Sequence, residues 1–254
     1  MGSVVHEVSR HPPAPVRFRK LIGKSMESMV LLGRFWIGLL LIQWLFYGPA
    51  QRLCAQSAGN ATVATKPGDV NLEFSRVFIF VDKSGVVGHE HAIEGKLKSG
   101  EIITQQGQPG KVVFDMRSFD ADTLVARKYL GLEGETDAAT RKKVNESMLG
   151  HEILDVAKYP EARLENISLK STGKKTKRDL PEYILEGDFV LHETKRHIEV
   201  RCDVEHKDGW NHVRGGFKIL QSDYGIKPFS KMLGAVGVKD QLVIMGDLWV
   251  VPTQ

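Results

Sequence analysis

The sequence has few cysteines and lacks the short motifs that mark several common enzyme classes. Only Cys54 and Cys202 are cysteines among its 254 residues. Cys54 lies in a segment that we expect to be removed, so the mature chain keeps one cysteine and cannot form an intramolecular disulfide. The chain contains no Gly-x-Ser-x-Gly, phosphate-binding loop, dinucleotide fingerprint or His-Glu-x-x-His motif. We therefore expect a protein that is not an enzyme.

The chain also lacks an apolar run of the length that spans a membrane. Its main apolar stretch, residues 35–47, has 13 residues, whereas a membrane-spanning helix needs roughly 20. The stretch follows basic residues and precedes Ala55, which is typical of a signal peptide. We predict that residues 1–55 are a signal peptide, with Met26 or Met29 as alternative starts, and that the mature protein is periplasmic or secreted. The alternative is an uncleaved N-terminal segment that anchors the protein to a membrane.

The predicted mature chain lacks a strong charge of either sign. Seven basic and two acidic residues give residues 1–55 a net charge of +5, and the whole chain carries +4, which leaves −1 for the remainder. A nearly neutral protein has no electrostatic footprint for nucleic acid. We interpret the basic run at residues 170–178 as a solvated hairpin loop, whereas the alternative is a patch for transient contact with a membrane surface. Whether the protein forms a homodimer is a question that the sequence leaves open.

Alternating apolar and polar residues predict β-strands over most of the mature chain. Residues 56–71 are small and polar and predict a flexible linker, which places the folded domain at residues 72–252. The strands are expected at residues 74–83, 111–119, 162–170, 183–192, 198–204, 212–222 and 241–251.

Residues 120–150 break this rhythm and predict one or two short helices. Asp122 is expected to cap a helix that runs to Leu130, and Thr136-Asp137 to cap another over residues 138–149. Roughly eight strands with one helical excursion predict an all-β fold, an eight-stranded antiparallel β-barrel of lipocalin-like size. A sandwich of two sheets is the alternative.

A barrel of this size holds either packed side chains or one small ligand. Large apolar residues on the predicted strands are therefore candidates for the lining of a ligand tunnel, and the alternative is that several of them only form the core. The candidates are Phe78, Phe80, Phe114, Met116, Phe189, Leu191, Phe217, Ile219 and Tyr224.

Several segments occur in a distinctive order along the chain. Residues 150–160 contain a Leu-Asp…Tyr-Pro pattern, residues 185–192 contain Gly-Asp…His, and Ser222-Asp223-Tyr224-Gly225-Ile226 and Val238-Lys239-Asp240 follow. In this order, residues 71–252 resemble the YceI-like, polyisoprenoid-binding proteins of the bacterial periplasm. The resemblance implies a lipocalin-like barrel that carries a long apolar lipid without catalysis, such as a polyprenyl lipid or the isoprenoid tail of a quinone.

The segment His89-Glu90-His91 carries the sharpest local chemistry. Alternate residues of a strand point to one face, so both imidazoles could reach one divalent metal ion such as Zn, Cu, Ni or Fe. The alternative function is then a metal-binding or redox-associated envelope protein, or a metal-dependent enzyme. A polar turn with solvated histidines is the simpler interpretation, and an envelope protein with a vestigial cavity is a third option. The expected third ligand is one of His151, Asp155, His192, His197 and His212.

Overall fold

The computed structural model describes residues 66–103 and 109–252. The predicted signal peptide and the first part of the predicted linker lie outside these residues. The described part of the linker, residues 66–71, contacts the folded domain, because Val70 is buried and pairs with Val250. Within the described ranges, none of the helices has the length and apolar character that crossing a membrane requires.

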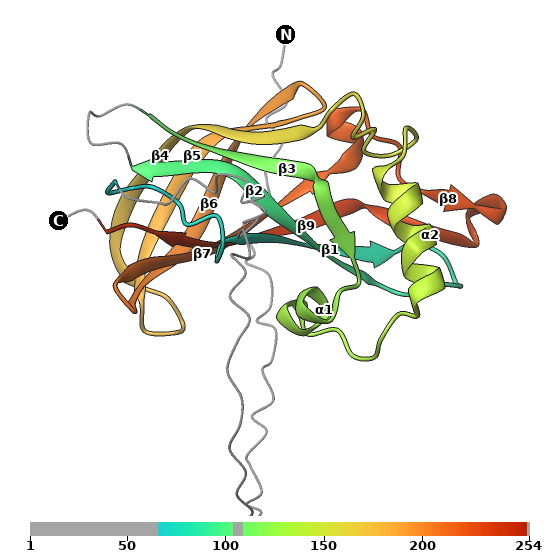
Figure 1. Ribbon diagram of the computed structural model, residues 1–254, viewed down its shortest axis with the longest axis horizontal. Coiled ribbons are helices and arrows are strands. Elements are labelled where there is room, and N and C mark those ends of the chain that lie inside the picture. The colour runs from blue at the N-terminus through green and yellow to red at the C-terminus, as the bar shows by residue number, and fades with distance from the viewer. Residues whose placement is uncertain (1–65, 104–108, 253–254) are drawn as a thin grey trace, which may run out of the picture. The chain divides into compact units, whose positions relative to one another are not determined.

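Eight antiparallel strands close into a barrel (Figure 1). Each strand pairs with the next, and the last one pairs with the first from Arg76↔Asp247 to Val81↔Leu242. This closure confirms the predicted eight-stranded barrel and excludes an open two-sheet sandwich. A two-residue strand, β8 (Ser230–Lys231), pairs only with β9. The barrel strands are β1 (Arg76–Lys83), β2 (His91–Ile103), β3 (Pro109–Ala121), β4 (Glu161–Lys175), β5 (Pro181–Leu191), β6 (Thr194–Lys207), β7 (Trp210–Leu220) and β9 (Val236–Val250).

The β2 strand has no counterpart among the strands predicted from the alternation. Its sequence contains Gly95 and Gly100, and glycine weakens a strand because it has no side chain to pack. Gly95 is required by a close approach, since a Cβ atom there would lie 2.2 Å from the Phe119 ring. Gly95, which weakens the strand pattern of β2 in the sequence, thus makes room for the Phe119 ring.

The barrel interior is the main core of the protein. Side chains from every barrel strand meet there, including Val77 of β1, Leu185 of β5 and Leu248 of β9. Cys202 belongs to this core, where it packs as a small apolar residue. Burial raises the pKa of its thiol to about 12, so the thiolate that reacts with oxidants and metals is disfavoured.

Both predicted helices form, and both lie within residues 120–150. The α1 helix (Leu124–Leu130) ends at Gly131, whose φ of 72° is left-handed. The α2 helix (Ala138–Leu149) begins at Asp137, whose carboxylate accepts from the N–H groups of Ala139 and Thr140, as predicted. Figure 1 shows α2 and the β8 segment at the same end of the barrel.

The predicted role of Asp122 as a helix cap is wrong. Thr123 caps α1 instead, because its hydroxyl oxygen accepts from the N–H of Ala126 at 3.0 Å. Asp122 has a φ of 56°, which turns its carboxylate away from the helix and toward the start of β2. The sequence places two residues with capping side chains next to each other, and only the backbone geometry distinguishes them.

The outer face of β1 is also covered. Phe78 is 3% exposed and packs with Ala92 and Ala126 in a second apolar cluster under α1. Its ring stacks on Tyr129 with 3.8 Å between ring centroids. This cluster attaches α1 to the barrel wall.

Replacing Phe78 should destabilise the protein through this outer cluster. We expect Phe78→Ala to lower the free energy of unfolding by about 3–5 kcal/mol, because it leaves a cavity between α1 and the sheet. Equilibrium unfolding in urea measures the change. The control Leu124→Ala removes a side chain that is 64% exposed on the same helix and should change stability by about 0.5 kcal/mol or less. Equal effects of the two variants would contradict the packing of α1 on Phe78.

Candidate functional site

The barrel holds an apolar cavity of about 310 Å³ at the end where α2 lies. Of the 25 residues that line it, 19 are apolar. They come from seven of the eight barrel strands, from α2, from the loop that follows α2 and from the segment before β8. The apolar residues are Val77, Ile79, Val81, Ile93, Phe114, Met116, Phe119, Val144, Met148, Ile153, Leu154, Ala162, Phe189, Leu191, Ile219, Phe229, Val238, Leu242 and Ile244.

Five of the nine residues predicted to line a tunnel lie in this lining. They come from β3, β5 and β7, where alternation placed one apolar face inward. Two others, Phe217 and Tyr224, lie behind the lining and pack edge-to-face against Phe189, with ring centroids 5.3 Å and 5.7 Å away. The five lining residues are Phe114, Met116, Phe189, Leu191 and Ile219.

The predicted inward face of β1 is wrong. Phe78 packs outside the barrel, and Phe80 shares its face because alternate residues of a strand point to the same side. The cavity is lined instead by Val77, Ile79 and Val81. Both faces of β1 carry large apolar residues, since α1 covers the outer one, so alternation alone could not identify the inner face.

Four of the six polar residues of the lining come from α2 and β8 at one end of the cavity, which we call its mouth. Thr140, Lys143 and Ser147 are spaced so that they lie on one face of α2. Lys231 of β8 adds a second ammonium group. The cavity is thus apolar inside and polar, with positive charge, where α2 and β8 meet its end.

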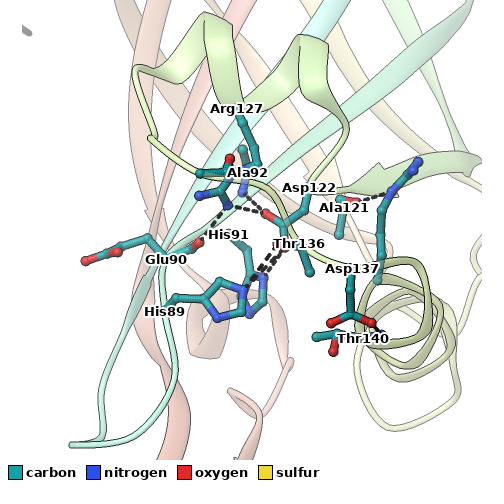
Figure 2. Close-up of polar contacts among 12 residues, drawn as sticks. His89, Glu90, His91, Ala92, Ala121, Asp122, Arg127, Thr136, Asp137 and Thr140 are labelled. Atoms are coloured by element: carbon teal, nitrogen blue, oxygen red, sulfur yellow. Dashed lines mark hydrogen bonds and ion pairs between the residues drawn. The ribbon is translucent and has the colours of Figure 1, made fainter.

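A cluster of two histidines and a carboxylate lies beside the cavity and is drawn in Figure 2. The His91 Nδ1 atom is 2.7 Å from Asp122 Oδ2, and the His89 Nε2 atom is 3.6 Å from the same oxygen. The two imidazole ring centroids are 4.5 Å apart. His91 also lines the cavity, so the cluster and the apolar cavity share a residue.

Asp122 is the fixed centre of this cluster. Its side chain is fully buried, and its other oxygen, Oδ1, accepts from the Ala92 N–H and the Arg127 guanidinium, each at 3.0 Å. Burial raises the pKa of the Asp122 carboxyl. The bonds from His91, Ala92 and Arg127 outweigh that effect and hold the pKa well below its usual range. Asp122 is therefore a buried carboxylate anion.

Arg127 connects the cluster to the surrounding chain. Besides Asp122, its guanidinium donates to the carbonyl oxygens of Glu90, Glu133 and Gly134. These acceptors lie just before β2 and in the loop between α1 and α2. One side chain thus fixes the segment that carries both histidines against α1 and the loop that follows it.

The five residues expected to supply a third ligand do not join the histidine pair. His192 Nε2 lies 2.8 Å from the Leu154 carbonyl oxygen and its ring stacks on Tyr159, which gives it a structural role. His212 lies 2.7 Å from Asp247. Among the described residues, the group of at least three His, Cys, Asp or Glu side chains that converge is His89, His91 and Asp122. Asp122 was missed because its proximity follows from the pairing of β2 with β3, and β2 was not recognised.

The fold and the cavity define the class of protein, a closed antiparallel β-barrel with an internal apolar pocket. The YceI-like domain family matches residues 63–248 of the chain. The match covers well over half of the sequence, and the chain therefore belongs to the YceI-like domain family.

Individual relatives match over shorter stretches. A UPF0312 protein of Pseudomonas savastanoi pv. phaseolicola is 38% identical over 82 residues, which are 30% of this chain and 40% of the relative. A UPF0312 protein of Pseudomonas putida strain W619 is 35% identical over 82 residues with the same coverage. The chain thus spans less than half the length of these curated relatives.

Two solved structures are similar to this chain at low sequence identity. BcnA of Burkholderia cenocepacia is 19% identical to this chain, with a TM-score of 0.47, and the match covers 72% of this chain and 100% of BcnA. A domain from Saccharophagus degradans, described as a polyisoprenoid binding domain, is 13% identical to this chain, with a TM-score of 0.46. The match covers 74% of this chain and 100% of that domain.

The ion pair between Asp122 and Arg127 should be strongly coupled. We expect Arg127→Met to lower the free energy of unfolding by about 3–5 kcal/mol, because it leaves a buried carboxylate without its guanidinium. The double variant Asp122→Asn/Arg127→Met should lose less than the sum of the single variants, by about 1–3 kcal/mol. Urea unfolding of the four proteins measures this coupling.

The control for this cycle is the pair Lys98–Glu161, whose side chains are 63% and 29% exposed. We expect Lys98→Met to cost less than about 1 kcal/mol, as for other surface ion pairs. Additive effects of the Asp122 and Arg127 substitutions would contradict a buried, coupled pair.

Proposed function

We propose that the protein is an exported carrier that binds an isoprenoid-type or other long apolar lipid in the barrel cavity and catalyses no reaction. The cavity is the observation that carries this proposal, because 19 of its 25 lining residues are apolar. A ligand pocket in a protein typically measures about 300–1,000 Å³, and this cavity of about 310 Å³ lies at the lower end of that range.

The energetics favour an apolar chain as the ligand. Burial of apolar surface is worth roughly 25 cal/mol per Å², so a hydrocarbon chain gains affinity from the wall without specific polar contacts. A charged head group would lose its hydration in the apolar interior. The head of a lipid therefore belongs at the polar mouth, near Lys143 and Lys231. The chain belongs to the YceI-like family, and its sequence resembles the polyisoprenoid-binding proteins of that family. An isoprenoid chain is therefore the first ligand to test.

Filling the mouth should weaken lipid binding without unfolding the barrel. Val144 is half-buried on α2 and lines the cavity, so we expect Val144→Trp to fill the mouth and weaken binding of a fluorescent farnesyl probe at least about tenfold. Fluorescence titration measures the dissociation constant, and mass spectrometry of extracted lipids measures what co-purifies.

The matched control is Lys142→Trp on the same helix, because the Lys142 side chain is 77% exposed. It should bind the probe as the unchanged protein does. Equal affinity of all three proteins, or a wild type that binds no apolar probe, would remove the carrier proposal.

A carrier also needs a way to reach lipid in a membrane, and the loops beside the mouth supply one. Four exposed apolar residues lie there: Val86 and Val87 between β1 and β2, and Met232 and Leu233 after β8. The two loops adjoin, since the Val87 N–H donates to the Ala235 carbonyl oxygen at 3.1 Å. We name these four residues the apolar tip.

The composition of the apolar tip suits the surface of an anionic bilayer. Met232 and Leu233 have φ values of 52° and 54°, a conformation that is uncommon for bulky residues, and their side chains remain exposed. Lys227 and Lys231 are exposed on the same segment, and a lysine near an anionic membrane surface contributes about 1 kcal/mol. The proposed contact is transient, with the apolar tip inserted at the level of the head groups.

We expect the variant Met232→Ser/Leu233→Ser to bind vesicles of mixed neutral and anionic phospholipid about tenfold more weakly than the wild type, because it removes apolar area from the contact. Co-sedimentation with vesicles measures this. The control Leu124→Ser/Val125→Ser changes two residues on α1 that are 64% and 59% exposed and should leave vesicle binding unchanged. Equal loss in both variants would show that general hydrophobicity, and not the apolar tip, determines the contact.

A further inference from the structure

We propose that His89, His91 and Asp122 bind one divalent transition-metal ion beside the cavity, which His91 lines. The three side chains each offer one ligand atom, and these atoms lie within 4.8 Å of one another. Two imidazole nitrogens and one carboxylate oxygen form a donor set that suits Zn²⁺, Fe²⁺, Ni²⁺ and Cu²⁺. This site goes beyond the proposed lipid binding and does not depend on it.

Two of the three separations between ligand atoms are close to those that an ion requires. Nitrogen and oxygen ligands lie about 2.1 Å from a zinc ion, so neighbouring ligand atoms are roughly 3.0–3.4 Å apart. In the structure, Asp122 Oδ2 is 2.7 Å from His91 Nδ1 and 3.6 Å from His89 Nε2. These two separations bracket that range. The third separation, between the two imidazole nitrogens, is within 4.8 Å, so the rings need to rotate toward one centre to bind the ion.

The carboxylate is held in position for this role. Oδ1 of Asp122 is occupied by Arg127 and the Ala92 N–H, which leaves Oδ2 directed at the histidines, as Figure 2 shows. Hydrogen bonds of this kind to a ligand side chain orient metal ligands in proteins and strengthen binding.

The two histidines supply access and an open coordination sphere. The His89 side chain is 44% exposed and that of His91 is 17% exposed, so an ion can arrive from solvent on the His89 side. Three protein ligands leave at least one position for an external ligand. His91 lines the cavity, so that position is open to an oxygen donor of a molecule bound there, such as a phosphate, hydroxyl or carbonyl group. This last step rests on the proposed lipid binding.

The structural interpretation of the cluster makes a different prediction. An ion pair between His91 and Asp122 accounts for the 2.7 Å contact by itself, and it assigns no role to His89. If the cluster only stabilises the fold, replacing His89 leaves the measured affinity of the protein for metal unchanged. His89 is therefore the residue whose replacement separates the two interpretations.

The test is a zinc titration of the purified, untagged full chain after treatment with a chelator. Isothermal titration calorimetry gives the stoichiometry and affinity, and the absorption spectrum of bound Co²⁺ reports the donor set. We expect one Zn²⁺ per chain at this site and a rise in the melting temperature with zinc. His89→Ala and His91→Ala should each weaken binding by about 100-fold or more, beyond the 10- to 100-fold typical of changes outside the ligand shell.

The matched control is His197→Ala. His197 is an exposed histidine beside a carboxylate, with Nδ1 3.3 Å from Asp188, and it lies outside the cluster. It should bind zinc as the wild type does. A wild type that binds no Zn²⁺ or Co²⁺, or a His89→Ala variant with unchanged affinity, would overturn the proposal. Lipid binding is measured separately, so its failure leaves this result unaffected.

Discussion

The antiparallel pairing of β1 with β9 is the interaction on which the rest of the structure depends. It joins the first strand to the last and leaves no open edge between them. Once the sheet is closed, the inner residues of all eight strands must face one another. Eight strands enclose an interior just wide enough for side chains or one small ligand. The apolar cavity is therefore a consequence of closure and of how far the inner side chains reach.

Closure also determines what happens outside the barrel. The outer face of β1 carries Phe78, which needs cover, and α1 supplies it through Ala126 and Tyr129. The helix must then be tied down, and Arg127 does this by binding Asp122 and three carbonyl oxygens around it. The position of the histidine cluster follows from this arrangement. A packing requirement on one side of β1 thus places a polar cluster beside the cavity, with His91 in its lining.

The sequence predicts the local features of this fold well and the non-local ones poorly. Alternation identified the strands on either side of the helices, and the carboxylate of Asp137 identified the start of α2. Each of these signals is local, because the residues that form it lie within a few positions of one another. The β2 strand was missed, since Gly95 serves a contact with Phe119 that is distant in the sequence. The inner face of β1 was misassigned for a similar reason: the helix that covers Phe78 cannot be seen in the strand itself.

The same distinction holds for the candidate site. The spacing of His89 and His91 was visible in the sequence, and their rings do lie side by side. Asp122 was not recognised as their neighbour, because an aspartate before a helix has the local pattern of a cap whether or not it serves as one. Only the pairing of Ile93 with Ala121 brings it to the histidines. A constellation that joins two strands is thus predictable only when both strands and their register are known.

The distribution of polar groups around the cavity gives the proposed ligand a direction. The deep lining from β1, β3 and β5 is apolar, and a charged head placed there would lose its hydration without compensation. Lys143 and Lys231 lie at the mouth, and His91 lies in the wall. A lipid with an apolar chain and an oxygen-rich head therefore gains most when the chain enters first and the head stays near these groups. The apolar tip adjoins the same mouth. A lipid in a membrane has its head at the surface, so it must turn during transfer if its chain is to enter the cavity first. Contact at the membrane surface would have to leave room for that rotation, which favours a transient contact over a firm insertion.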